Sequence, residues 1–210
     1  MKSKIILKSV NQKLNENGDC GDEIIVPNCI IGNISSHLEY LYLSQEYSDF
    51  TIIINGEKIN CHKFILYDNS IFFKALLQPH TIESQKGIVE FNENDYPITS
   101  NSFRILLLYF YTRRINETTN PRECLEILLV EELFDLKKEQ YGKLLEYCQH
   151  ILDDCIQVKD CLILLTIAFK WNQEELMDKM IQMAVDNYQE IEQDPLFVKL
   201  DQKLISKLRN

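Results

Sequence analysis

The sequence predicts an α+β fold, in which a small sheet of about three strands is flanked by helices and followed by an all-α extension. Two observations predict the sheet. Apolar, β-branched runs on either side of Asn55-Gly56 specify a hairpin over residues 50–61, and residues 88–91 have the composition of a third strand. A third observation predicts the extension, because apolar residues after Asn120 recur at helical spacing.

The hairpin is the strongest local signal in the chain. A type I′ turn needs positive φ at both central residues, which Asn55 and Gly56 tolerate. The first run, Phe50–Ile54, is apolar on both faces, so we expect it to be the central strand. The second run, Glu57–Cys61, alternates in polarity, which predicts that one of its faces contacts water.

Helical patterns flank these strands. Ile34, Leu38 and Leu41 have the spacing of one helical face, which predicts a helix over residues 34–47 with a polar cap among residues 33–36. The further expected segments are short helices around 62–67 and 70–77, a polar loop over 78–87, and a helix over 99–112.

Four or five helices are expected after residue 113. Asn120-Pro121 predicts a capped helix start with Pro at the first helical position. Asn172 and Glu175 have the spacing of a capping box. Asp194-Pro195 is expected to open the last helix, with leucines along one line of it, namely Leu196, Leu200, Leu204 and Leu208.

Charge and hydropathy exclude some classes of partner. The chain has 210 residues and a formal net charge of −10, which argues against nucleic acid and anionic membranes. Its longest uninterrupted apolar run is Ile105–Tyr111, whereas a membrane-spanning helix needs about 20 residues. The first ten residues lack the core of a signal peptide.

The seven cysteines do not indicate a metal site. Their spacing is irregular and contains no C-x-x-C, so we expect structural thiols, among them Cys148 and Cys155 at helical spacing among apolar residues. Cys61 and His62 are neighbours on a strand and should point to opposite faces, which excludes a nucleophile pair. Without a catalytic or cofactor motif, we expect neither an enzyme nor a cofactor nor a bound metal.

The order of these elements resembles the BTB/POZ family. The resemblance continues at Ile88–Phe91 and Phe103–Thr112, whereas Arg113-Arg114 stands where the family often has Thr-Gly. The residues that carry it most clearly are Ser48, Asp49, Phe50, Cys61, His62, Lys63, Phe64, Ile65, Leu66, Ser70, Phe72, Phe73, Leu76 and Leu77.

This resemblance implies a division of the chain into three parts. Residues 33–150 are expected to form the BTB/POZ domain, and residues 151–210 a helical extension that resembles the start of a BACK region. Residues 1–32 are expected to be a partly ordered N-terminal extension. Within it, residues 23–26 either exchange with a second subunit as a strand or fold back on their own chain.

The resemblance implies a protein-interaction module that forms homodimers through its first helix. The expected dimer interface comprises Ile34, Leu38, Leu41, Asp49 and Lys63. In the family the last two positions form a charged pair, and the alternative is that the Asp49 carboxylate bonds nearby backbone. His62 occupies a family position and is expected to be a hydrogen-bonded core histidine.

Some family members bind a cullin scaffold through a hydrophobic-x-Glu motif in the loop before the third strand. Counting back from that strand places Thr81, Ile82 and Glu83 at the motif. Glu83 matches it, but threonine replaces the hydrophobic residue, unless a shift by one residue lets Ile82 take that role. The trailing helices of relatives lengthen the cullin groove, which we also expect here.

Two functions follow from the resemblance. The first is an adaptor that bridges a cullin-RING ubiquitin ligase to a protein substrate. The second is an oligomerisation scaffold that binds no cullin. The absence of a kelch-like repeat or other substrate-binding domain in these residues favours it. We expect the protein in the cytoplasm, the nucleus or both. No basic localisation cluster is present that would decide between the two compartments.

Overall fold

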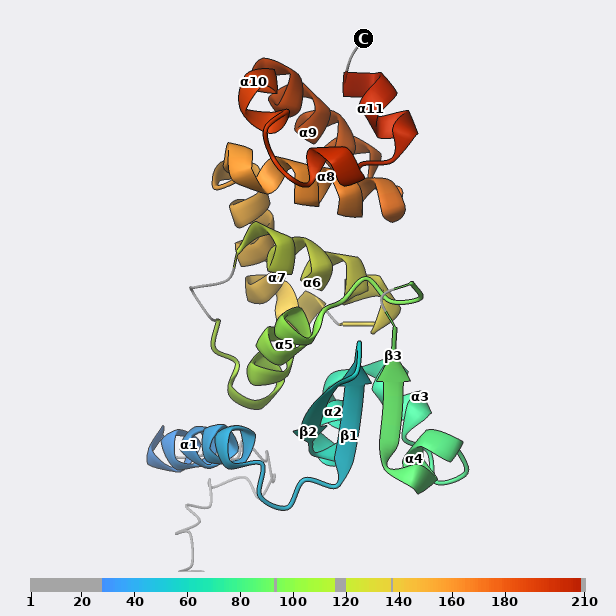
Figure 1. The fold of residues 1–210 in the computed structure, drawn as a ribbon. Helices are drawn as coiled ribbons and strands as arrows, with labels where there is room; N and C mark the ends of the chain where they lie inside the picture. Colours follow the sequence, from blue (N-terminus) through green and yellow to red (C-terminus); the bar gives the residue numbers. More distant parts are fainter. Residues whose placement is uncertain (1–27, 93, 116–119, 137, 209–210) are drawn as a thin grey trace, which may run out of the picture.

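The computed structural model describes residues 28–92, 94–115, 120–136 and 138–208, without the side chains of residues 28–35, 138 and 139. A small sheet and α1–α5 form one end of the molecule, α6 and α7 the middle, and α8–α11 the other end (Figure 1). The first part contains α1 (Asn28–Ser44), β1 (Phe50–Ile54), β2 (Glu57–Cys61), α2 (Lys63–Asn69), α3 (Ile71–Leu76), α4 (Ile82–Lys86), β3 (Ile88–Phe91) and α5 (Ser100–Thr112). The remainder contains α6 (Pro121–Leu133), α7 (Lys138–Asp154), α8 (Cys161–Lys170), α9 (Glu174–Asp186), α10 (Tyr188–Ile191) and α11 (Gln202–Leu208).

The sheet has the predicted three strands in the order β2-β1-β3. β1 pairs antiparallel with β2 and parallel with β3, so the fully apolar strand is central, as its sequence predicts. Asn55 and Gly56 join the antiparallel pair with φ of 51° and 83°, which confirms the hairpin turn. β2 buries only Ile59 and Cys61, so its predicted wet face is also present.

An aromatic cluster joins the sheet to the helices. Phe134, directly after α6, lies with its ring centroid 5.1 Å from that of Phe73 on α3 and 6.0 Å from that of Phe91 on β3. The ring centroid of Phe103 on α5 lies 6.4 Å from that of Phe134. The Ser70 hydroxyl donates to the carbonyl oxygen of Phe134 at 2.5 Å, which ties the start of α3 to the end of α6.

α1 begins earlier and ends earlier than predicted. It starts at Asn28 instead of Ile34, so the polar residues 33–36 lie inside the helix and do not cap it. Ile30 and Ile31 extend the apolar pattern upstream, which accounts for the earlier start. The helix ends at Ser44, where Gln45 and Tyr47 adopt positive φ.

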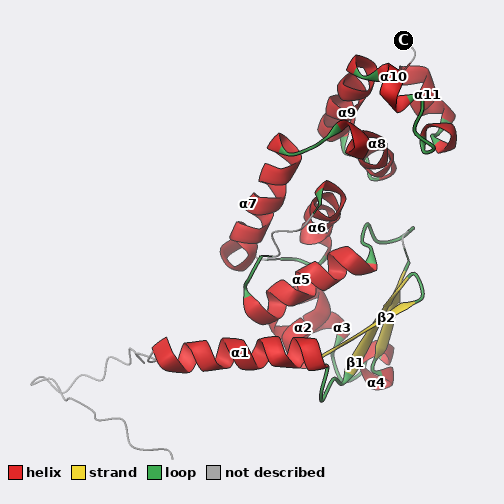
Figure 2. Cartoon of the chain, turned by 60° about the vertical axis from the view of Figure 1, so that its left-hand side comes forward, coloured by secondary structure: helices red, strands yellow, loops and turns green. Residues whose placement is uncertain are grey.

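Arg113 and Arg114 each contact another helix of the domain. Arg113 caps the C-terminus of α5 in the left-handed conformation, with φ of 58°. Its guanidinium lies 5.3 Å from the centre of the Tyr141 ring on α7. Arg114 forms an ion pair with Glu39 at 2.7 Å and so links the end of α5 to α1, which lies along α5 (Figure 2).

Capping follows the sequence at α6 and departs from it at α9. Asn120 and Glu123 form a capping box around Pro121. The predicted box of Asn172 and Glu175 does not form, because Asn172 adopts φ of 54° and terminates α8. Asparagine tolerates this left-handed position, and the next amide then donates to the carbonyl of Ala168 at 2.8 Å.

The predicted last helix is interrupted. Asp194-Pro195 leads into a 3₁₀ turn over Phe197–Lys199, and Leu200 is extended before α11 begins. Leu204 and Leu208 are buried on α11. The leucine spacing therefore predicts which residues are buried, although the helix is not continuous. Six α-helices lie after residue 113 in the described ranges, against the four or five predicted, because this turn and α10 divide the end of the chain.

Both predicted domain boundaries fall inside helices. The boundary after residue 32 lies within α1, and the boundary after residue 150 lies within α7. The division of the chain into three parts stays a prediction. The predicted strand at 23–26 lies outside the described residues. No helix within the described ranges is both long and apolar enough to cross a membrane.

Removing Phe73 should destabilise the whole domain. Its side chain is fully buried in the aromatic cluster, so Phe73→Ala is expected to lower the free energy of unfolding by about 3–5 kcal/mol. Ile71→Ala, on the same helix at a residue 45% exposed, should cost under about 1 kcal/mol. Urea unfolding followed by circular dichroism measures both. Equal losses would contradict the assignment of this cluster as the core.

Candidate functional site

α1 presents two different faces. Leu38, Leu41 and Tyr42 are half-buried against the core, and the Tyr42 hydroxyl donates to the Arg104 carbonyl on α5 at 3.3 Å. Tyr40 and Leu43 lie two residues after Leu38 and Leu41, and they are 52% and 71% exposed. A two-residue step rotates a side chain by about 200° around a helix, so these two residues point away from the core.

Tyr40 and Leu43 belong to a larger exposed apolar surface, which we call the α1 patch. Its other members are Tyr47, 87% exposed, and Phe64 at the start of α2, 55% exposed. The patch is held together through Glu46: its carboxylate accepts from the Tyr40 hydroxyl at 2.9 Å, and its carbonyl is bonded by the ring of His62 at 2.8 Å. The same hydrogen bond and the charge of Glu46 raise the pKa of the Tyr40 phenol.

His62 is the buried histidine that the sequence predicts. One ring nitrogen is hydrogen-bonded to the Tyr111 hydroxyl at 2.5 Å, and the other to the carbonyl of Glu46. Burial raises the pKa of Tyr111 well above its ordinary value. With both nitrogens occupied, His62 positions the loop between α1 and β1 and offers no free base.

The remaining predicted interface residues are placed as follows. Ile34 lies in α1, but its side chain lies outside the described part of the chain. Asp49 accepts a hydrogen bond from the backbone amide of Lys63 at 2.8 Å. The Lys63 ammonium donates to the carbonyl of Ser84 at 2.7 Å, so among the described side chains this carboxylate and this ammonium form no ion pair. This arrangement matches the backbone alternative for Asp49.

Residues 78–87 are not the polar loop that the sequence predicts, because they contain the short helix α4. Thr81 is its N-cap, and the threonine hydroxyl accepts from the amide of Ser84 and donates to the Leu76 carbonyl at 2.6 Å. Gly87 ends the helix at φ of 67°, a conformation that favours glycine. The polar residues read as a loop are therefore the capping residues of one helical turn.

This helix decides how the predicted motif is displayed. Thr81 is turned into the protein by its capping bonds, whereas Ile82, at the first helical position, is 63% exposed. Glu83 follows in the first turn and is half-buried. The structure thus brings an exposed aliphatic side chain and a carboxylate next to each other.

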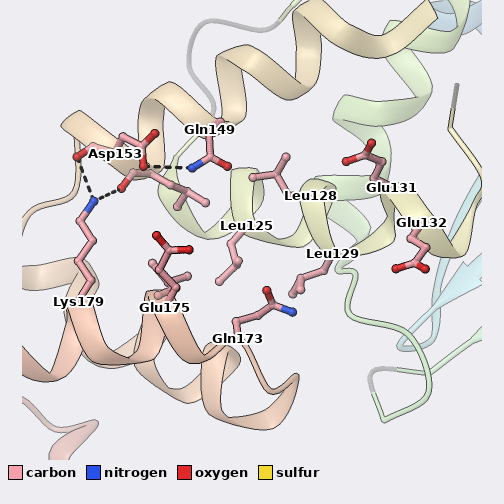
Figure 3. A pocket seen from close by; sticks show the side chains of 12 residues that line it. Leu125, Leu128, Leu129, Glu131, Glu132, Gln149, Asp153, Gln173, Glu175 and Lys179 are labelled. Atoms are coloured by element: carbon pink, nitrogen blue, oxygen red, sulfur yellow. Dashed lines mark hydrogen bonds between the residues drawn. The ribbon is translucent and has the colours of Figure 1, made fainter. Parts of the chain in front are cut away.

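A groove of about 570 Å³ lies between α6, α7 and α9, and we call it the α6–α9 groove (Figure 3). Leucines form its floor, and polar and charged side chains form its rim. The lining residues are Leu125, Leu128, Leu129, Glu131, Glu132, Gln149, Leu152, Asp153, Gln173, Glu175, Leu176 and Lys179. No pattern in the sequence predicts this groove, because α9 approaches α6 and α7 only in the folded chain.

Comparison with known proteins identifies the family. The BTB/POZ domain profile matches residues 38–154, which is more than half of the chain. The chain belongs to the BTB/POZ family. The match ends at Asp154, the last residue of α7.

Curated relatives contain this BTB domain within longer proteins. Human Kelch repeat and BTB domain-containing protein 2 is 24% identical over 176 residues, which cover 82% of this chain and 26% of that protein. Kelch-like protein 8 of Caenorhabditis elegans is 24% identical over 177 residues, which cover 84% of this chain and 24% of that protein. The chain therefore spans about a quarter of the length of these relatives. As a BTB domain, it is a protein-interaction module.

The buried thiols of the BTB domain and its extension are not poised as nucleophiles. Burial raises the pKa of Cys61 to about 12 and that of Cys161 to about 11. A hydrogen bond with Cys124, together with burial, also raises the pKa of Cys148. Cys155 is exposed, contrary to the expectation that it lies among apolar residues. Among the described residues, no group of histidine, cysteine and carboxylate side chains has the arrangement of a metal site.

Thiol alkylation should separate these cysteines. In the folded protein at pH 8, iodoacetamide is expected to modify Cys155, whereas Cys61, Cys124, Cys148 and Cys161 stay protected, because buried neutral thiols react poorly. In 8 M urea all five should react. Peptide mapping by mass spectrometry gives the extent of reaction at each residue. Rapid modification of Cys61 in the folded state would contradict its raised pKa.

Proposed function

We propose that this BTB protein dimerises and serves as an adaptor, binding a cullin scaffold and bringing a protein substrate to it for ubiquitylation. The observation that carries the proposal is the display on α4, where an exposed Ile82 lies next to Glu83 at the position of the cullin-binding motif, although Thr81 departs from that motif. The names of the curated relatives add that such domains occur in Kelch proteins.

In this proposal Ile82 takes the role of the hydrophobic anchor. Thr81 is unsuited to it, because its hydroxyl already bonds within the protein and its side chain has little apolar area. An isoleucine side chain exposed at the first turn of α4 can enter a pocket of the partner, and one such anchor can contribute about 2 kcal/mol or more to an interface. Glu83 adds a charged group that can pair with a basic residue of the scaffold.

Replacing the proposed anchor should weaken cullin binding. Ile82→Asp and Glu83→Lys are each expected to raise the dissociation constant for a cullin N-terminal region at least about tenfold, which corresponds to about 1.4 kcal/mol. Ile71→Asp is the control, since Ile71 is 45% exposed on α3 and lies outside both the motif and the trailing helices. Isothermal titration calorimetry measures the affinity, and thermal melting verifies the fold. Unchanged binding by Ile82→Asp would exclude this anchor.

The α1 patch supports the proposed dimer. Its four exposed apolar side chains come from α1, the following loop and α2, which Glu46 connects through its hydrogen bonds to Tyr40 and His62. Exposed apolar surface of this kind is a common mark of a protein interface. A two-fold axis through the patch would pair each residue with the same surface of the second copy. Leu38 and Leu41 would support that surface from the core side and would not contact the partner directly.

A charge in the α1 patch should separate the dimer. Leu43→Asp is expected to convert a dimer of about twice 24.8 kDa into a monomer, because the carboxylate would be buried without a partner. Val185→Asp, at a residue 46% exposed on α9, should remain dimeric. Size exclusion with light scattering measures both masses. A monomeric wild-type protein, or a dimeric Leu43→Asp variant, would contradict the proposed interface.

The alternative is an oligomerisation scaffold that binds no cullin. The capping role of Thr81 favours it, because the family motif places a hydrophobic residue at this position and the threonine side chain points into the protein. A wild-type dimer that does not bind the cullin N-terminal region would select this alternative over the adaptor.

A further inference from the structure

The rim of the α6–α9 groove is strongly acidic. Four carboxylates line it, from Glu131, Glu132, Asp153 and Glu175. The one basic residue of the rim, Lys179, is already engaged, because its ammonium donates to the carbonyl oxygens of Leu152 at 2.7 Å and Asp153 at 3.0 Å. These bonds cap the end of α7 and are drawn in Figure 3. The groove therefore attracts positive charge.

The floor of the groove is apolar. Leu128, Leu129 and Leu176 are only half-buried, although they belong to helices that pack against one another. Covering them would remove apolar surface from water, which is favourable in proportion to the area buried. An occupant that satisfies the whole groove combines aliphatic side chains for the floor with lysine or arginine for the rim.

One segment of this chain has that combination. Residues 2–8 read Lys-Ser-Lys-Ile-Ile-Leu-Lys, so three consecutive aliphatic residues lie between lysines. By contrast, residues 14–57 contain no lysine or arginine. The other basic and aliphatic stretch, residues 203–208, is already folded as part of α11 with Leu204 and Leu208 buried.

We infer that residues 2–8 dock in the α6–α9 groove of the same molecule, with Ile5, Ile6 and Leu7 on the leucine floor and the lysines against the acidic rim. This inference concerns a contact within the chain and does not rest on cullin binding. It assigns the groove an internal occupant, which any external partner of the groove would have to displace.

The length of the chain permits this contact. Residues 9–27 separate the segment from the start of α1 and reach about 65 Å when extended. The distance to be spanned is shorter, because α1 is about 26 Å long and packs on α5, which packs on α6, with about 10 Å between the axes of packed helices. Such a tether gives an effective concentration on the order of millimolar, so a weak intrinsic affinity is enough to keep the groove occupied.

Zero-length crosslinking of the full chain tests the contact directly. A carbodiimide joins a lysine to a carboxylate only when the two groups touch. We expect crosslinks from Lys2, Lys4 or Lys8 to the four rim carboxylates, at yields at least fivefold above those from Lys13. In an equimolar mixture of unlabelled and ¹⁵N-labelled protein, contacts within one molecule give only uniformly unlabelled or uniformly labelled crosslinked peptides, whereas contacts between two copies give mixed pairs in about half of the products.

Two matched variants complete the test. Glu132→Lys combined with Glu175→Lys changes two exposed residues of the rim and should lower the crosslink yield from Lys4 to Glu131 and Asp153 at least fivefold. Glu190→Lys combined with Glu192→Lys makes the same change of charge at exposed residues outside the groove and should leave that yield unchanged.

Three results would overturn the inference: crosslinks scattered over acidic residues outside the rim, an equal effect of the two double variants, or crosslinks of which about half join a labelled to an unlabelled copy. The last result would place a second copy of the chain in the groove. Cullin affinity enters none of these measurements, so they stand apart from the test of the adaptor role.

Discussion

The contact between Phe134 and the aromatic rings of three other elements is the interaction on which the arrangement of this molecule depends. Rings from α3, β3 and α5 surround it, and the carbonyl of the same residue accepts the Ser70 hydroxyl. Because aromatic rings bury large areas, a cluster of this kind holds the sheet against the helices. It also sets where α6 ends and therefore where α7 and the extension begin.

The surfaces available for protein contact follow from this core. α1 packs on α5 through one face, and the ion pair between Arg114 and Glu39 holds it there, so its other face is left to solvent. The hydrogen bonds of His62 and Asp49 hold the loop before β1 against the residues that follow β2. α4 lies directly before the start of β3, and Thr81 and Gly87 delimit it as a single helical turn. The outward face of α1 therefore follows from its packing on α5, whereas the outward position of Ile82 on α4 follows from local helix geometry.

The α6–α9 groove has a different origin. It lies where the family match ends, so one wall belongs to the BTB domain and the other to the helices that follow. Its acid-rich rim combines residues of α6, α7 and the start of α9. The first and the last of the residues that line the groove are about fifty positions apart in the sequence. A binding surface assembled in this way can change with the extension while the BTB core remains the same.

Local patterns in the sequence determined the hairpin at Asn55-Gly56, the central position of β1, the Asn120 cap and the family, because each depends on residues close together or on their order along the chain. The start of α1, the helix in residues 82–86 and the role of Asn172 were decided by structure, since a polar residue can cap, terminate or lie within a helix depending on the neighbouring turn. Only the tertiary structure decided which side of α1 is exposed and where the groove lies. Both depend on contacts between distant helices, and helical periodicity does not specify which partner a face will pack against.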